Sequence, residues 1–127
     1  FESATTIQSV SADFLPATTV SQYCYYRMFY GCSSLTTAPT LPAVSLSSSQ
    51  RYCYQYMFYN CRNLNYIKAM FTTDPGSRNS TNQAYYTYNW VSGVASSGTF
   101  VKNSSATWNR TGVWAVPSGW TIQTASS

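Results

Sequence analysis

One stretch of this sequence occurs twice, first as Tyr23-Cys24-Tyr25-Tyr26-Arg27-Met28-Phe29-Tyr30-Gly31-Cys32-Ser33-Ser34-Leu35. The second copy begins 29 residues later and reads Tyr52-Cys53-Tyr54-Gln55-Tyr56-Met57-Phe58-Tyr59-Asn60-Cys61-Arg62-Asn63-Leu64. Eight of the 13 positions are identical, and a Leu-Pro-Ala sequence precedes each copy, at residues 15–17 and 41–43. This identity indicates an internal duplication, so the fold has to be predicted from the repeat.

The spacing of sulfur-containing residues within each copy predicts a short helix. Cys24, Met28 and Cys32 follow one another at intervals of four residues, which places three apolar side chains on one face of about two helical turns. The second copy has the same spacing, with Cys53, Met57 and Cys61.

Short extended segments are predicted after each helix, at residues 36–38 and 65–67, because Pro39 and Pro42 prevent the first helix from continuing. A unit of short helix, turn and short strand that repeats every 20 to 30 residues or so is typical of a leucine-rich-repeat solenoid. Such units bury their apolar faces against neighbouring units. The duplicated part is therefore predicted to stack its two copies side by side.

The motif Met28-Phe29-x-x-Cys32-x-x-Leu35, followed by Leu41-Pro42, resembles the Phe-x-x-Cys-x-x-Leu…Pro repeat of BspA-like bacterial surface proteins. The resemblance covers residues 15 to about 70. The chain departs from the family pattern at Ala38, where the family usually has Ile, and at Met70-Phe71, which replace Leu-Pro. The resemblance implies an extracellular bacterial or phage-associated protein whose relatives act in attachment.

The second half of the chain is predicted to be all β. Residues 74–82 form a polar, turn-rich linker, and Trp90-Val91 and residues 99–101 flank a short loop in a pattern that favours a β-hairpin. Further short strands are expected at Trp108, 113–116 and 120–122, with a turn at 117–119. The predicted fold is α/β: a short leucine-rich-repeat solenoid over residues 1–72 and a C-terminal all-β cap over 73–127. A separate carbohydrate-binding β domain is the alternative for the second part.

The inventory of reactive side chains argues against an enzyme. The chain has no histidine, and its three carboxylates, Glu2, Asp13 and Asp74, are not paired by any motif. No phosphate-binding loop is present, and no cofactor is expected.

Composition also narrows the classes of partner. Charged residues make up only 8% of the chain, and the seven basic residues are spread out, so we expect no nucleic-acid partner. No run of about 18 apolar residues occurs, so we expect no membrane insertion. The chain begins at Phe1 without a basic and apolar leader, and we expect it to be part of a longer protein.

Four cysteines occur as two Cys-x7-Cys pairs, a spacing unlike that of structural zinc sites, so no metal is expected. Two arrangements remain open. One is a ladder of buried free thiols in stacked repeats, and the other is a pair of bridges, Cys24–Cys53 and Cys32–Cys61.

Candidate ligand-binding residues are found where the two copies differ. The exchanged residues are mostly Tyr, Ser, Gly, Asn and Arg, the types that dominate antibody binding surfaces. The alternative is that these positions face solvent without constraint. The tyrosines that both copies share are expected to pack between repeats with their hydroxyls reaching water. The predicted ligand-binding residues are Tyr26, Arg27, Tyr56, Asn60, Arg62 and Asn63.

Together these features predict a non-enzymatic extracellular recognition or adhesion module, on a bacterial cell surface or at a phage tail tip. Its partner is expected to be a protein or glycan on a cell surface. Three alternatives remain: a diversified ligand-binding protein, a structural spacer, and a carbohydrate-binding module. The last of these would use Trp90, Trp108, Trp114 and Trp120, which are otherwise expected to be buried in the cap.

Overall fold

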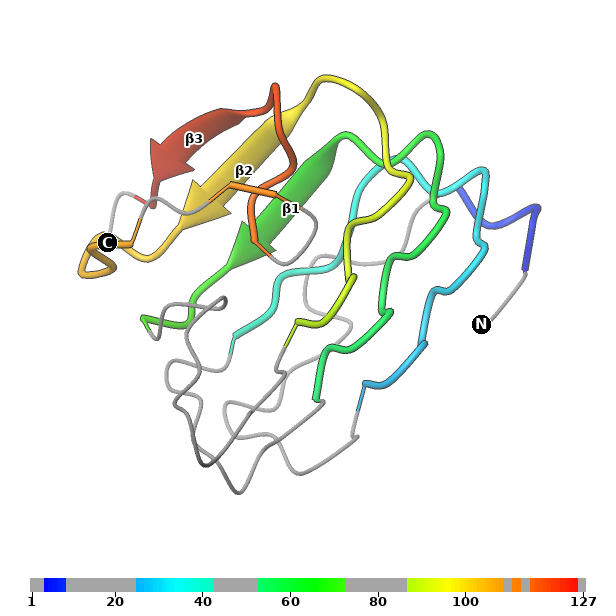
Figure 1. Ribbon diagram of the computed structural model, residues 1–127, viewed down its shortest axis with the longest axis horizontal. Helices are drawn as coiled ribbons and strands as arrows, with labels where there is room; N and C mark the ends of the chain where they lie inside the picture. Colours follow the sequence, from blue (N-terminus) through cyan, green and yellow to red (C-terminus); the bar gives the residue numbers. More distant parts are fainter. Residues whose placement is uncertain are drawn as a thin grey trace.

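The structure is a computed structural model that describes residues 4–8, 25–42, 53–72, 87–108, 111–112 and 115–125. These residues contain three short strands, β1 (Tyr66–Ala69), β2 (Thr99–Lys102) and β3 (Thr121–Thr124), and no helix. The strands form one parallel sheet in the order β1-β2-β3, visible in Figure 1.

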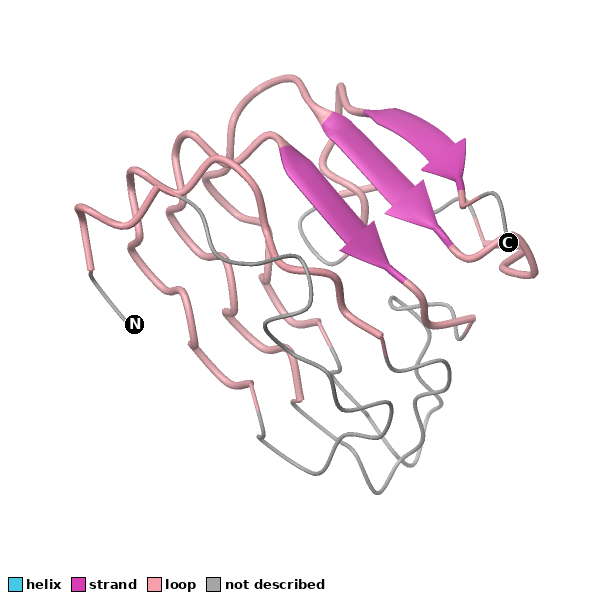
Figure 2. Ribbon diagram, turned by 180° about the vertical axis from the view of Figure 1, so that it is seen from behind, coloured by secondary structure: helices cyan, strands magenta, loops and turns pink. Residues whose placement is uncertain are grey.

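The described residues from 25 onwards form four layers, which we number by sequence. Layer 1 comprises residues 25–42, layer 2 residues 53–72, layer 3 residues 87–108, and layer 4 residues 111–112 and 115–125. Layers 2, 3 and 4 each contribute one strand to the sheet. Layer 1 joins β1 through two isolated parallel bridges, between Thr37 and Tyr66 and between Leu41 and Ala69. In Figure 2 the first three layers also run side by side opposite the sheet.

That opposite side consists of consecutive turns, which we call the turn segments: residues 25–31, 54–60 and 87–93. In the segments of layers 1 and 2, alternate N–H groups donate to the next layer. Phe29 donates to the Met57 carbonyl at 2.9 Å, and Phe58 donates to the Trp90 carbonyl at 2.9 Å. The intervening N–H groups donate within their own layer, as Cys32 does to the Phe29 carbonyl three residues back.

The turn segments also contain left-handed residues at intervals of four. Arg27 and Gly31 have φ of 56° and 74°, and the equivalent residues of layer 2, Tyr56 and Asn60, have φ of 55° and 60°. An α-helix needs negative φ at every residue and directs each N–H to a carbonyl of the same helix. The predicted helix-plus-strand solenoid is therefore wrong: the described residues form no helix, and the repeats stack as turns joined by hydrogen bonds.

The helical pattern in the sequence has a different structural origin. In layer 2 the fully buried side chains include Tyr54, Met57, Phe58, Cys61 and Leu64, at positions i, i+3, i+4, i+7 and i+10. This is the spacing expected of an amphipathic helix. A ribbon of turns that repeats every four residues buries the same positions, so the spacing cannot distinguish the two backbones.

The predicted C-terminal all-β cap with a hairpin is also wrong. β2 pairs in parallel with β1 and β3, and Trp90-Val91 lies in the turn segment of layer 3 rather than in a strand. The predicted strand at 120–122 is confirmed in part by β3, and the turn at 117–119 is confirmed. The sheet crosses the predicted domain boundary at residue 72. The linker at 74–82 and the pair 113–114 lie outside the described residues.

The core fills the space between the turn segments and the sheet. Aromatic rings of successive layers lie over one another: Phe29 stacks on Phe58 with a centroid distance of 5.8 Å and an interplanar angle of 5°. Trp90 of layer 3 continues this column at 5.9 Å from Phe58, and Phe100 of β2 contacts Trp90 from the sheet side at 6.1 Å. Burial of these rings makes each layer depend on its neighbours.

The left-handed backbone at Asn60 yields a stability prediction. Because glycine has no steric penalty at φ of 60°, we expect Asn60→Gly to leave the free energy of unfolding nearly unchanged. A β-branched residue does have this penalty, so Asn60→Val should destabilise the fold by about 1–2 kcal/mol. Urea denaturation measures both. Arg62→Val, at a nearby exposed residue outside the left-handed set, is the control and should change stability by less than about 0.5 kcal/mol. Equal effects of the two valine substitutions would contradict the turn geometry.

Candidate functional site

Five tyrosines from three layers meet on the outer side of the turn segments. Tyr56 lies at their centre, and four other rings meet it edge to face, with centroid distances of 5.5–6.2 Å and interplanar angles of 75–86°. We call this group the tyrosine cluster; it comprises Tyr26, Tyr30, Tyr56, Tyr59 and Tyr88. Edge-to-face contacts of this kind each contribute roughly 0.5–1.5 kcal/mol beyond burial.

The layer stacking brings these rings together. Equivalent residues of adjacent layers lie over one another, so Tyr30 stacks on Tyr59 with a centroid distance of 4.9 Å and an interplanar angle of 11°. The Arg27 guanidinium lies over the Tyr30 ring at 4.1 Å, within the range of a cation–π interaction. The cluster therefore combines aromatic faces, phenolic hydroxyls and one positive charge.

The backbone beneath the cluster is strained. Arg27 and Tyr56 are bulky residues with φ of 56° and 55°, in a region that Gly and Asn occupy more easily. The equivalent residue of layer 3 is Asn89, with φ of 49°, which shows that the stack accepts asparagine here. Strain of about 1–3 kcal/mol at a single residue is common at functional sites.

The cluster is partly open to solvent. Tyr26 is 38% exposed, and the other four tyrosines are half-buried. Tyrosine rings with accessible hydroxyls can cover apolar surface on a ligand and also hydrogen-bond it. Within the described part of the chain no three histidine, cysteine or acidic side chains gather as a metal site would require.

The pKa of Tyr56 is raised above its ordinary value of 10.0, chiefly because burial disfavours the phenolate. Charge on the neighbouring Tyr88, Tyr26 and Tyr59 hydroxyls raises the pKa further, and a hydrogen bond with the Asn89 side chain opposes these effects. At neutral pH the Tyr56 hydroxyl is therefore protonated and able to donate a hydrogen bond.

The structure separates the predicted ligand-binding residues into two groups. Tyr26, Arg27 and Tyr56 belong to the tyrosine cluster or contact it, whereas the remaining three lie further along layer 2. Asn60 has positive φ, and its side-chain oxygen occupies the space that a Cβ on Gly93 would need. The Asn63 side-chain amide donates to the Ser33 carbonyl at 2.7 Å. Arg62 is exposed. A ligand contact by this second group remains a prediction.

Sequence reasoning missed Tyr88, because layer 3 was not identified as a third copy of the turn segment. The signal was present as Asn89 and Gly93, which are four residues apart like Arg27 and Gly31. The tyrosines shared by both copies were expected to pack between repeats with their hydroxyls reaching water. The stacking and half-burial of Tyr30 and Tyr59 fit this, but it is wrong for Tyr54, which is fully buried together with its hydroxyl.

Three of the four tryptophans are buried. From the sequence, this burial is expected if the tryptophans do not bind carbohydrate. Trp90, Trp108 and Trp120 are 0%, 6% and 7% exposed. The Trp90 indole donates to the Ala115 carbonyl at 2.9 Å, and the Trp120 indole donates to the Ala95 carbonyl at 2.8 Å. These two indoles fasten layer 4 to layer 3, so their positions have a structural explanation. Trp114 lies outside the described residues.

Cys32, Cys53 and Cys61 are buried free thiols, as in the first of the two arrangements that the sequence left open, and the Cys32–Cys61 bridge of the second is not formed. Cys24 lies outside the described residues. The Cys61 thiol donates to the Phe29 carbonyl at 3.0 Å, across the boundary between layers 2 and 1. Burial, with a smaller contribution from Cys32, raises the pKa of Cys61 to about 12. The thiols therefore act as core residues that also join layers.

The described residues contain no helix long and apolar enough to cross a lipid bilayer. Comparison of the chain with protein-family models, with curated proteins and with solved structures finds no match. The resemblance to BspA-like proteins therefore stays a prediction from the repeat motif, without the leucine-rich-repeat fold that it implied.

The raised pKa of Cys61 predicts a pH-dependent stability. Folding favours the protonated form of the Cys61 thiol. The contribution of this thiol to the free energy of unfolding is therefore complete below the unfolded pKa of 9.0 and is lost as the pH rises from 9.0 towards 12. We expect the stability difference between wild type and Cys61→Ala to narrow by about 2 kcal/mol between about pH 8 and about pH 10.5. Urea denaturation under reducing conditions measures this difference. A difference that stays constant with pH would show that the Cys61 thiol ionises as readily in the folded chain as in the unfolded one.

Proposed function

We propose that this chain is a non-enzymatic, extracellular recognition module that binds a protein or glycan on a cell surface through the tyrosine cluster. The observation that carries this proposal is the position of Tyr56, a bulky residue held at φ of 55° in the centre of a partly exposed group of aromatic rings.

The stacked fold alone does not call for tyrosine at this position. Asn89 occupies the equivalent place in layer 3 with φ of 49° and supports the same pattern of hydrogen bonds to layer 2. The side chain of Tyr56 is half-buried and lies outside the apolar core. The strain at Tyr56 is therefore best explained by a use for its ring at the surface.

The chemistry of the cluster fits recognition rather than catalysis. Tyrosine offers a large rigid contact area at low entropic cost, and tyrosine and arginine are the residues most often dominant in binding interfaces. Arg27 provides a positive charge at the cluster. These features favour a neutral or negatively charged ligand with flat or apolar faces.

The proposal predicts that replacing Tyr56 weakens binding of the ligand while the chain stays folded. Tyr56→Asn removes four edge-to-face contacts but relieves the backbone strain, so we expect the free energy of unfolding to fall by about 1–4 kcal/mol while the chain stays folded. Binding of the fluorescently labelled chain to arrayed glycans and to whole bacterial cells should weaken at least about tenfold. Tyr26→Ala should weaken binding in the same assays.

Two further variants serve as comparisons. Ser105→Ala, in an exposed turn after β2, should bind as wild type does. Arg62→Ala tests whether the second group of predicted residues takes part. If the Tyr56→Asn variant stays folded and binds as wild type does, the tyrosine cluster is a structural feature and the proposal fails.

A further inference from the structure

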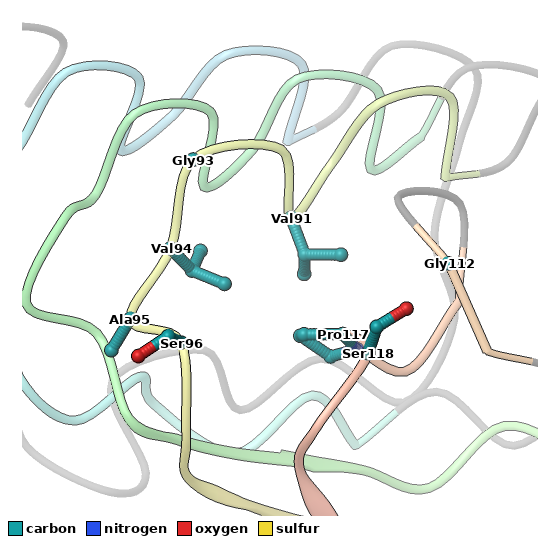
Figure 3. Close-up of a pocket in the computed structure, with 8 residues that line it drawn as sticks. All are labelled: Val91, Gly93, Val94, Ala95, Ser96, Gly112, Pro117 and Ser118. Atoms are coloured by element: carbon teal, nitrogen blue, oxygen red, sulfur yellow. The ribbon is translucent and has the colours of Figure 1, made fainter.

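A small cavity opens beside the turn segment of layer 3, away from the tyrosine cluster. It has a volume of about 190 Å³ and lies between layers 3 and 4. Figure 3 shows the side chains of Val91 and Val94 pointing into it and Pro117 and Ser118 on the opposite side. The residues that line it are Val91, Gly93, Val94, Ala95, Ser96, Gly112, Pro117 and Ser118.

Two backbone donors on the edge of this cavity have no acceptor among the residues that the structure describes. The left-handed residues Gly31, Asn60 and Gly93 mark equivalent positions, so Val91 and Gly93 correspond to Phe58 and Asn60 of layer 2. The N–H groups of Phe58 and Asn60 donate to layer 3 at 2.9 and 2.8 Å. Within the part of the chain that the structure describes, the N–H groups of Val91 and Gly93 meet no such partner.

The direction of these donors follows from the stacking. The carbonyls of Trp90 and Ser92 accept hydrogen bonds from layer 2, so the alternate N–H groups of Val91 and Gly93 face away from layer 2. Val91 and Gly93 both line the cavity on that side. The cavity thus presents two N–H donors that are two residues apart. The equivalent donors of layers 1 and 2 are paired with carbonyls of the next layer.

The lining favours a peptide over an ion. All eight lining residues are neutral, so no side chain supplies the opposite charge that would hold an ion. The side chains of Ser96 and Ser118 add hydroxyls, and Val91, Val94, Ala95 and Pro117 supply apolar surface. Backbone donors with an apolar, uncharged lining are typical of sites that bind an extended peptide along an open edge.

We infer that the open edge of layer 3 is a peptide-binding site. It binds a segment of a partner protein that has small side chains. Two carbonyl oxygens of this segment, two residues apart, accept hydrogen bonds from the N–H groups of Val91 and Gly93. The bound segment extends the stack, because it accepts hydrogen bonds from layer 3 as layer 3 accepts them from layer 2. This site shares no residue with the tyrosine cluster and does not depend on the function proposed for that cluster.

Backbone amide hydrogen exchange, followed by NMR, tests this inference directly. The probe is acetyl-Val-Ser-Gly-Val-Ala-amide, which copies residues 91–95 and carries acceptors at its acetyl and serine carbonyls. In the free protein we expect the amide of Gly93 to exchange much faster than that of Asn60. With the peptide at about ten times its Kd, exchange at Val91 and Gly93 should slow about tenfold.

Matched variants locate the effect. Ser118→Phe places a bulky side chain at the cavity from an exposed turn and should abolish the protection, whereas Ser105→Phe, in a different exposed turn, should not. Four results would overturn the inference: slow exchange at Gly93 before the peptide is added, equal protection by sodium acetate, protection that grows with protein concentration alone, or protection by the peptide that survives Ser118→Phe. The second result indicates an anion site and the third a contact between copies of this chain.

Discussion

The structure depends on two kinds of backbone hydrogen bond, one within a layer and one between adjacent layers. In the turn segments of layers 1 and 2, one N–H closes a turn within its layer and the next donates to the following layer, as Cys32 and Phe29 illustrate. The left-handed residues at intervals of four make this alternation possible, because each reverses the local direction of the chain. Since half of these donors are met only by another layer, no layer can satisfy its backbone alone.

The same constraint shapes the surface. In-register stacking places equivalent side chains over one another, which aligns Phe29 with Phe58 in the core and Tyr30 with Tyr59 outside it. The left-handed positions tolerate few residue types, yet Tyr56 occupies one of them at the centre of the tyrosine cluster. At layer 3 this stacking ends, and there the N–H groups of Val91 and Gly93 have no acceptor within the described part of the chain. The two proposed binding sites, one formed by side chains and the other by backbone groups, therefore lie in different parts of the stack.

The sequence predicted the duplication and the side-by-side packing of its copies, but not the backbone that carries them. Burial at three- and four-residue spacing is shared by helices and by this ribbon of turns, so Met57 and Cys61 could not distinguish them. The exchange of Gly31 for Asn60 was assigned to a ligand surface, although both residues share positive φ. Layer 3 was missed because side-chain identity is low there, whereas the left-handed positions of Asn89 and Gly93 persist. Tyr26 and Tyr56 are in contact and Arg27 lies over the Tyr30 ring, but the predicted role of these residues in binding a ligand stays a prediction.

The most direct test of this structure is the measurement of scalar couplings across hydrogen bonds by NMR, which identify the donor and acceptor of each bond. The stacked turns predict couplings from the Phe29 nitrogen to the Met57 carbonyl carbon and from the Phe58 nitrogen to the Trp90 carbonyl carbon. A helix would instead couple the Phe58 nitrogen to the carbonyl carbon of Tyr54, four residues earlier. Observation of that local coupling, without the couplings between layers, would contradict the fold and with it both proposed binding sites.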